Sequence, residues 1–198
     1  MSEPIQNLQV LILAGGKSRR MGRDKALLCL DNQSLLQRTV EIATSISPRV
    51  WVVTPWRDEY QFVFSERVQW LDDPKQAGGL VAIAHSFPQL VTSEWILAIA
   101  CDMPFLNTEQ LEIWAQQLTE IPSTYTAALV RRDQRYEPLC GFYRCTVRRS
   151  LEKFVANGGR SFQKWLATEQ VYELTLEAEK MLFNCNTPTD FATLKAKP

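Results

Sequence analysis

The sequence lacks three features that would place it in a specialised class of protein. Its 22 lysines and arginines are matched by 22 aspartates and glutamates, so it has no overall basic character of the kind that binds nucleic acids. No stretch approaches the roughly 18 apolar residues of a membrane span. The N-terminal residues MSEPIQNLQ also lack the basic and apolar regions of a signal peptide. We therefore expect a cytoplasmic protein that binds neither nucleic acids nor membranes.

Cysteine and histidine, the residues of many metal and nucleophilic sites, are scarce. The five cysteines are Cys29, Cys101, Cys140, Cys145 and Cys185. Their number is odd and they form no CxxC pair, which argues against a disulfide framework and against a zinc site. The single histidine, His85, falls within a predicted helix and has no obvious nucleophile partner. We interpret it as a packed or surface residue.

Apolar runs alternate with helical patterns over the first 120 residues. Runs at 9–14, 49–54, 68–73 and 95–102 predict four buried strands. Between and after them, helices are predicted from a Ser34 cap to about Ser47, through GGLVAIAHSFPQL, and after a cap at Asn107 or Thr108. This alternation predicts an α/β fold with three α/β/α layers, right-handed crossovers and a mainly parallel, Rossmann-like sheet.

The pattern changes after residue 120. Residues 124–144 read as two strands joined by a charged turn, which predicts an antiparallel C-terminal addition to the sheet. Two short helices separated by Gly158 and Gly159 follow, and then a strand at 171–176. A final helix is predicted with Thr187 as its cap and Pro188 at its first position.

Polar or glycine residues stand at the ends of three of the predicted parallel strands. Gly15 and Gly16 follow the first strand, Asp72 and Asp73 end the third, and Asp102 ends the fourth. Ligands of open parallel sheets bind at the carboxyl ends of the strands. A carboxylate at the end of a buried strand must be solvated, paired or bound to metal. Asp102 is suited to hold Mg2+, whereas Asp72 and Asp73 fit a turn as well as a ligand site.

A cluster of basic residues follows the glycine turn: Lys17, Arg19, Arg20, Arg23 and Lys25. The turn is not a P-loop, because Leu11 stands where GxxxxGK[ST] requires glycine, and the GxGxxG fingerprint fails as well. The cluster carries enough charge to oppose the roughly −4 of a triphosphate. The alternative is a surface turn with a solvated basic face.

Four motifs in the same order resemble those of the molybdenum cofactor guanylyltransferases, within the nucleotidyltransferase superfamily. They are LAGGKSRRMGRDK (13–25), ACDMPFL (100–106), EPLCGFY (137–143) and FNCNTPTDF (183–191). The resemblance implies transfer of GMP from GTP to molybdenum-bound molybdopterin, with Mg2+ as cofactor and pyrophosphate as product. It also implies one nucleotidyltransferase domain, with a nucleotide-binding half (1–120) and an acceptor-substrate half (121–198).

The same resemblance implies roles for individual residues on the nucleotide side. The turn residues that would cradle the nucleotide, with backbone groups reading the guanine edge, are Leu13, Ala14, Gly15 and Gly16. Arg20 and Lys25 would neutralise the phosphates, Lys25 at the α-phosphate. Asp73 would be the nucleotide-binding acid, and Asp102 would bind Mg2+ and touch the GTP. Catalysis would then depend on positioning and charge neutralisation by Lys25, Arg20 and Asp102, without a covalent intermediate.

On the acceptor side, Asn184 and Asn186 match the asparagines that the family associates with the pterin. Pro138 and Leu139 would line the same pocket. Because the terminal phosphate of molybdopterin is already an anionic nucleophile, no strong general base is required. A further hypothesis, compatible with catalysis, is that the protein docks to apo-molybdoenzymes or other cofactor-biosynthesis proteins and delivers its product to them.

The chain departs from the family at residues 78–82, where GGLVA replaces the usual GPLAG. Gly79 stands in place of the proline and Ala82 in place of the last glycine. Two alternatives stay open at this stage. One is a cytidylyltransferase acting on the same cofactor, although those relatives usually carry LAAG, so Gly16 favours guanine. The other is a non-catalytic carrier of the cofactor, which would not need both Lys25 and Asp102.

Overall fold

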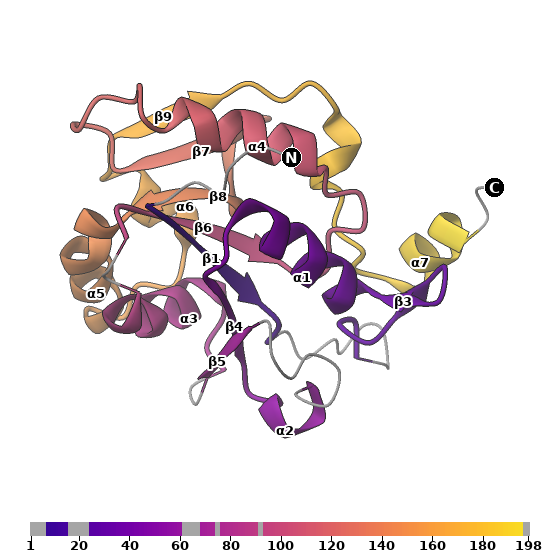
Figure 1. The fold of residues 1–198 in the computed structure, drawn as a ribbon. Helices are drawn as coiled ribbons and strands as arrows, with labels where there is room; N and C mark the ends of the chain where they lie inside the picture. The colour runs from indigo at the N-terminus through magenta and orange to yellow at the C-terminus, as the bar shows by residue number, and fades with distance from the viewer. Residues whose placement is uncertain (1–6, 16–23, 61–67, 74–75, 91–92, 196–198) are drawn as a thin grey trace.

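The computed structural model describes residues 7–15, 24–60, 68–73, 76–90 and 93–195. A seven-stranded sheet runs through the molecule with helices on both faces (Figure 1). Its strands, in chain order, are β1 (Leu8–Leu13), β4 (Val50–Thr54), β5 (Gln69–Asp72), β6 (Trp95–Ala100), β7 (Ala127–Arg132), β8 (Arg135–Arg144) and β9 (Val171–Leu174). A separate small hairpin pairs β2 (Cys29–Leu30) with β3 (Gln33–Ser34).

Seven α-helices and three 3-10 turns are seen in the part of the chain that the structure describes. The α-helices are α1 (Leu35–Ile46), α2 (Arg57–Tyr60), α3 (Gly79–Ser86), α4 (Thr108–Gln117), α5 (Arg148–Ala156), α6 (Phe162–Leu166) and α7 (Pro188–Lys195). The 3-10 turns are η2 (Phe87–Gln89), η3 (Cys145–Val147) and η4 (Glu179–Leu182). Over these same residues, none of the helices combines the length and the apolar character needed to cross a membrane.

The strand order is β5-β4-β1-β6-β8-β7-β9. Strands β1, β4, β5 and β6 pair in parallel, as the sequence predicts, and β9 pairs in parallel with β7. Strand β8 pairs antiparallel with both of its neighbours, β6 and β7. The predicted α/β class is therefore confirmed. The antiparallel addition is inserted beside the central strand β6, so that both parts of the chain share one sheet.

The alternation of buried side chains along the strands builds two cores, one on each face of the sheet. In β1, Leu8, Val10 and Ile12 pack into the core on the side of α1 and α4. Leu11 and Leu13 pack into the core on the side of α3, α5 and α6. Because both faces of β1 are covered, its sequence reads as an unbroken apolar run rather than as an alternating one.

Local capping explains where two of the helices begin. At α1, Gln37 N donates to Ser34 Oγ across 3.1 Å, and Ser34 N donates to the Gln37 side chain across 2.8 Å. This reciprocal pair is a capping box, and it confirms the predicted Ser34 cap. At α4, Gln110 N donates to Asn107 Oδ1 across 2.8 Å. Asn107 is therefore the cap, which decides between the two candidates that the sequence allowed.

The topology places several loops at one edge of the sheet. The parallel strands β1, β4, β5 and β6 all end there, and the antiparallel strand β8 begins there. From β1 the chain continues to β4 and β5 on one side of β1, and it then crosses to β6 on the other side. The strand order therefore reverses between β1 and β6. Ligands of open α/β sheets bind in the crevice at such a point.

Candidate active site

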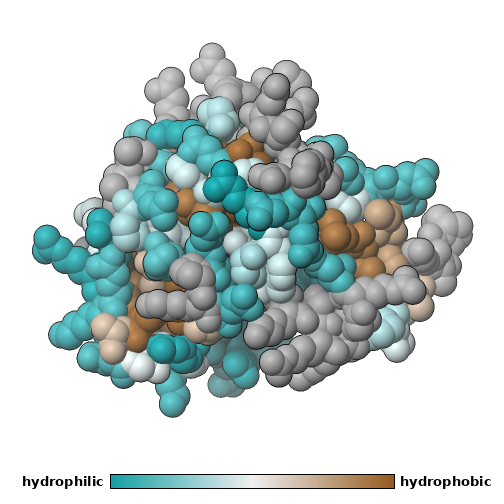
Figure 2. Space-filling view, turned by 90° about the horizontal axis from the view of Figure 1, so that it is seen from below, coloured by the Kyte–Doolittle hydropathy of each residue, from teal (hydrophilic) through white to brown (hydrophobic). Residues whose placement is uncertain are grey.

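A cleft of about 310 Å³ opens at the carboxyl ends of β1 and β6. The predicted site residues that line it are Leu13, Ala14, Gly15, Lys25, Asp73, Asp102, Leu139, Asn184 and Asn186. Pro138 lines a separate cavity beside the β7–β8 turn. Gly16 and Arg20 lie outside the described residues. Figure 2 shows the molecule from below, the side on which α2 lies in Figure 1. This face is mainly hydrophilic, with separate hydrophobic patches.

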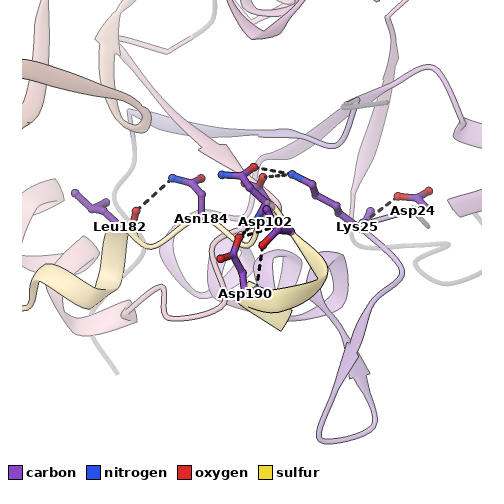
Figure 3. Close-up of polar contacts among 9 residues, drawn as sticks. Asp24, Lys25, Asp102, Leu182, Asn184 and Asp190 are labelled. Atoms are coloured by element: carbon purple, nitrogen blue, oxygen red, sulfur yellow. Dashed lines mark hydrogen bonds and ion pairs between the residues drawn. The ribbon is translucent and has the colours of Figure 1, made fainter. Parts of the chain in front are cut away.

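Lys25 links three distant parts of the chain within this cleft (Figure 3). Its Nζ lies 3.3 Å from Asp102 Oδ2 and donates to Asn186 Oδ1 across 2.7 Å. The side chains of Lys25 and Asp102 are 17% and 20% exposed, so the pair is largely withdrawn from water but open to the cleft. A lysine ammonium in this position combines a full positive charge with three donors that can be redirected to phosphate oxygens.

Asp102 uses only part of its hydrogen-bonding capacity. Among the described residues, its Oδ1 atom is buried and has no hydrogen-bond partner. The loop that carries it is fixed from behind, because Cys185 N donates to the Asp102 backbone carbonyl across 2.8 Å. A buried, unpartnered carboxylate oxygen is costly unless it meets a cation or a donor. This oxygen atom therefore fits a ligand.

The donor set agrees with Mg2+ rather than with a metal held entirely by protein. Within the described residues, no group of three or more histidine, cysteine, aspartate or glutamate side chains could enclose a metal ion. Mg2+ usually takes one or two carboxylates and completes its octahedral shell with water and substrate phosphates. Asp102 alone can supply such a carboxylate.

Of the two acids that end β5, only Asp73 lines the cleft. Its side chain is buried, and its Oδ1 accepts a hydrogen bond of 3.1 Å from Gln76 N, whereas Asp72 is exposed. Asp73 Oδ2 lies opposite Gly15, where an added Cβ would stand 3.3 Å away from it. A side chain at position 15 would therefore crowd this carboxylate oxygen.

The backbone around Ala14 is already engaged by the sheet. Ala14 N donates to Val53 O across 3.0 Å, and the Thr54 hydroxyl donates to Ala14 O across 2.9 Å. Cys101 N donates to Leu13 O across 3.2 Å. The Ala14 N–H is therefore committed, whereas each of the two carbonyls keeps a second lone pair. Any reading of a base by these residues has to use those carbonyls rather than the Ala14 amide.

Two cleft-side residues, Asp24 and Tyr60, were not among the sequence candidates. Asp24 lines the cleft directly before Lys25, and its Oδ2 accepts a hydrogen bond from the Tyr60 hydroxyl. Tyr60 is fully buried, and that burial, followed by the bond to Asp24, raises the pKa of its phenol. Asp24 belongs to the first motif (13–25), so the sequence could have identified it as a candidate site residue. Tyr60 follows β4 in a segment without hydrophobic periodicity, and nothing in the sequence marked it as a site residue.

The segment that carries Asn186 is fixed by a second capping arrangement. Asn186 N and Thr187 N both donate to Asp190 Oδ2 across 2.8 Å, and Asp190 N donates to Thr187 Oγ1 across 3.1 Å. The bond from Asn186 N is the main cause that lowers the pKa of Asp190. Asn184 points its amide to Leu182 O across 3.3 Å. The Thr187 cap is confirmed, and it fixes the backbone from which Asn186 reaches Lys25.

In the part of the chain that the structure describes, the cysteines and the histidine near the cleft do not form a nucleophilic site. Cys101 lines the cleft, but burial raises the pKa of its thiol. Burial likewise raises the pKa of Cys185 to about 11. Both thiols are therefore protonated at neutral pH and are weak nucleophiles. His85 is exposed on α3 and is not among the residues that line the cleft.

The arrangement of the cleft can be compared with known proteins. A family model described as MobA-like NTP transferase domain matches residues 10–171, which include the glycine turn, Lys25 and Asp102. The chain belongs to this family. The match ends before the C-terminal tail that carries Asn184 and Asn186.

Individual members of the MobA-like family resemble the chain over nearly its whole length. A relative from Synechococcus elongatus is 45% identical over 192 residues, covering 96% of this chain and 98% of the relative. A relative from Nostoc is 42% identical over 193 residues, which cover 98% of this chain and 93% of the relative. Both are named probable molybdenum cofactor guanylyltransferases. The resemblance inferred from four motifs is thereby confirmed.

A solved structure of a MobA-like protein agrees with the fold. Molybdopterin-guanine dinucleotide biosynthesis protein A from Archaeoglobus fulgidus superposes with a TM-score of 0.78. The superposed region covers 94% of this chain and 96% of the Archaeoglobus chain, and the two sequences are 22% identical. The similarity supports the same arrangement of strands and helices.

The departure at residues 78–82 is accommodated within the fold. Gly78 caps α3 with φ of +97°, a backbone conformation that favours glycine. Gly79 stands at the first position of α3, and a Cβ added there would meet Leu13 and Phe162 at 3.4 Å. Gly78, Gly79 and Ala82 all line the cleft. The helix therefore forms and reaches the cleft without the proline that the family usually carries.

Proposed function

We propose that the protein transfers GMP from GTP to molybdenum-bearing molybdopterin and releases pyrophosphate. The observation that carries this proposal is the placement of Lys25 between Asp102 and Asn186 in one cleft. Lys25 and Asp102 belong to the proposed nucleotide side of the cleft, and Asn186 belongs to the proposed acceptor side. The names of the relatives from Synechococcus and Nostoc support the same activity.

In this proposal the nucleotide lies across the end of β1. Leu13, Ala14 and Gly15 form its cradle, with the second lone pairs of the Leu13 and Ala14 carbonyls available to a base. Gly16, which lies outside the described residues, stays a predicted part of the cradle. Asp73 bounds the cradle opposite Gly15, where absence of a Cβ leaves room for a close approach.

Lys25 is proposed to bind the α-phosphate. To do so its ammonium would exchange the contacts with Asp102 and Asn186 for phosphate oxygens, which accept strong charge-assisted hydrogen bonds. The positive charge would stabilise the negative charge that develops as the bond to the leaving pyrophosphate breaks. Arg20 lies outside the described residues and stays a predicted second cation for the phosphates.

Asp102 is proposed to bind Mg2+ through Oδ1, the buried oxygen atom that lacks a partner among the described residues. A bound Mg2+ neutralises phosphate charge and holds phosphate oxygens in a fixed geometry. Before the nucleotide binds, Asp102 Oδ2 holds the Lys25 ammonium at the cleft. The acceptor phosphate needs no strong general base, and burial keeps the neighbouring Cys101 protonated.

Asn184 and Asn186 are proposed to hold the pterin side of the acceptor, with Leu139 as an apolar wall. Under this division, residues 1–120 supply the nucleotide-binding half of a single domain and residues 121–198 the acceptor half. We further propose that the protein acts in the cytoplasm and passes its product to apo-molybdoenzymes or other cofactor-biosynthesis proteins.

The proposal is tested by pyrophosphate release from purified protein with molybdenum-loaded molybdopterin, comparing GTP with CTP. We expect release with GTP, dependence on added Mg2+, and loss of activity with EDTA. Asp102→Asn should lower turnover by about two orders of magnitude and weaken the response to Mg2+. The exposed Asp72→Asn is the matched control. A preference for CTP would instead indicate the cytidylyltransferase, and GTP binding without any release would indicate a carrier.

A further inference from the structure

Three carboxylates line the cleft, those of Asp24, Asp73 and Asp102, and both oxygen atoms of Asp24 are held by protein donors. Its Oδ2 accepts from the Tyr60 hydroxyl, and its Oδ1 accepts from Ala26 N across 3.0 Å. Asp102 differs, because its Oδ1 has no partner among the described residues. Asp102 therefore has an oxygen atom open to a ligand, whereas each Asp24 oxygen atom already accepts a hydrogen bond from the fold.

The bonds to Asp24 fix the turn from which Lys25 projects. The bond to Ala26 N spans two residues and encloses Lys25 in an Asx turn. Leu28 N then donates to Lys25 O across 3.1 Å, and Leu36 N donates to Ala26 O across 3.0 Å. The backbone at Lys25 is thus tied to the first turn of α1. This anchoring fixes the point on the backbone from which the Lys25 side chain extends to Asp102 and Asn186.

Tyr60 holds the other side of Asp24. Its side chain is fully buried and packs in the core between the sheet and α1. A buried hydroxyl without a partner is costly, so its bond to Asp24 is favoured strongly. Tyr60 ends α2, which directly follows β4, so the rigid sheet is connected through Tyr60 and Asp24 to the Lys25 turn.

The saturation of Asp24 also has an electrostatic consequence. A carboxylate lining a cleft for a triphosphate would repel it, unless the carboxylate is held away by donors of its own. The Tyr60 hydroxyl and the Ala26 amide are two such donors. They keep the oxygen atoms turned toward the fold. The carboxylate of Asp24 offers one acceptor oxygen atom to each of these two donors.

We propose that Asp24 and Tyr60 are positioning residues for Lys25. They hold the lysine turn so that the ammonium stands beside Asp102 and Asn186, where the α-phosphate would bind. The inference rests on the proposed function for the role of Lys25 toward phosphate. The contact of Lys25 with Asp102 and Asn186 does not depend on that role.

The central test is Tyr60→Phe, which keeps the ring and removes the hydroxyl. We expect kcat/KM for pyrophosphate release to fall about tenfold, as for one lost hydrogen bond to a charged group. Ser47→Ala is the matched control, because Ser47 is buried and its hydroxyl donates to Leu8 O across 2.7 Å, at the opposite end of β1. Thermal melting of both variants verifies that they fold.

A double-mutant cycle separates positioning from general destabilisation. In a Lys25→Ala background, Tyr60→Phe should have no further effect on kcat/KM, because the residue that it positions is gone. An equal fall in both backgrounds would overturn the proposal. Asp24→Ala, which removes both acceptors, should give a larger fall than Tyr60→Phe. It too should have no effect when Lys25 is absent.

A measurement without substrates distinguishes this inference from the proposed function. The acylation rate of Lys25 by an N-hydroxysuccinimide ester is followed by peptide mass spectrometry in the unliganded protein. We expect faster labelling of Lys25 in Tyr60→Phe and an unchanged rate in Ser47→Ala. Unchanged labelling in Tyr60→Phe would overturn the positioning role. Faster labelling in a protein whose wild type transfers no nucleotide would support the positioning role and reject the proposed function.

Discussion

Lys25 and Asn186 stand 161 positions apart in the chain, and the lysine ammonium donates a hydrogen bond of 2.7 Å to the asparagine oxygen. The bond joins the first motif of the sequence to the last. A group proposed to bind phosphate and a group proposed to bind the acceptor thus contact each other before either substrate is present. Binding of GTP to Lys25 would release Asn186 for the acceptor.

Replacing Lys25 by alanine should lower turnover by about two orders of magnitude, because the cation nearest to the proposed α-phosphate site is lost. The measurement is the rate of pyrophosphate release at saturating GTP. Lys153→Ala, an exposed lysine of α5, is the control and should keep the wild-type rate. A near-native rate in Lys25→Ala would reject its catalytic role.

Replacing Asn186 by aspartate should raise the KM for GTP about tenfold. The new carboxylate would form an ion pair with Lys25, and that ion pair would compete with the phosphates for the ammonium. Asn157→Asp makes the same chemical change at an exposed position that follows α5 and should leave the KM unchanged. Tighter binding of GTP by Asn186→Asp would contradict the exchange of contacts proposed for Lys25.

Asp190 should make the stability of the protein depend on pH in the acid range. Its pKa in the folded protein is lowered from the ordinary 3.8, mainly by the bond from Asn186 N. A lowered carboxylate pKa stabilises the folded state fully above the unfolded value, and that stabilisation is lost as the pH falls through the folded value. The Tm difference between wild type and Asp190→Asn should therefore be full at pH 7 and shrink below pH 3.8. A difference that does not vary with pH would assign the effect to packing.

Gly78 and Gly79 should respond differently to alanine, although they are neighbours. Gly78 has φ of +97°, so Gly78→Ala should reduce the free energy of unfolding by about 1 kcal/mol. Gly79 is the first residue of α3, and an added methyl would meet its neighbours at 3.4 to 3.5 Å. Gly79→Ala should change stability by less than about 0.5 kcal/mol. Urea denaturation of the two variants gives the comparison, and equal losses would contradict it.

Much of the fold could be predicted from the sequence because buried strands and capped helices leave local signals. The apolar run before Asp102 and the serine before α1 are examples, and both lie where the patterns placed them. The insertion of β8 beside β6 could not be predicted, because strand order depends on pairings between residues far apart in the chain. The sequence indicated that two antiparallel strands and a last strand follow residue 120, but it did not indicate their places in the sheet.

Individual residues of the site could be predicted from the sequence, but the contacts between them could not. Lys25, Asp73 and Asp102 stand in motifs or at strand ends, so sequence reasoning identified them as candidates. The contact of Lys25 with Asn186 and the support of Asp24 by Tyr60 were not visible. Tyr60 reads as one more buried aromatic residue, and its hydroxyl acquires a partner only when α2 is placed beside the lysine turn. The partner of a long-range hydrogen bond is decided by the fold.

The pairing of β8 with β6 also limits how the molecule can admit its two substrates. Trp95 to Ile99 pair with Arg144 to Cys140, so the two parts of the chain are joined by a continuous hydrogen-bonded ladder. A hinge between them would have to break that ladder in the middle of the sheet. While the ladder is intact, the two parts of the chain cannot swing apart as separate bodies, so the two substrates meet over one continuous floor.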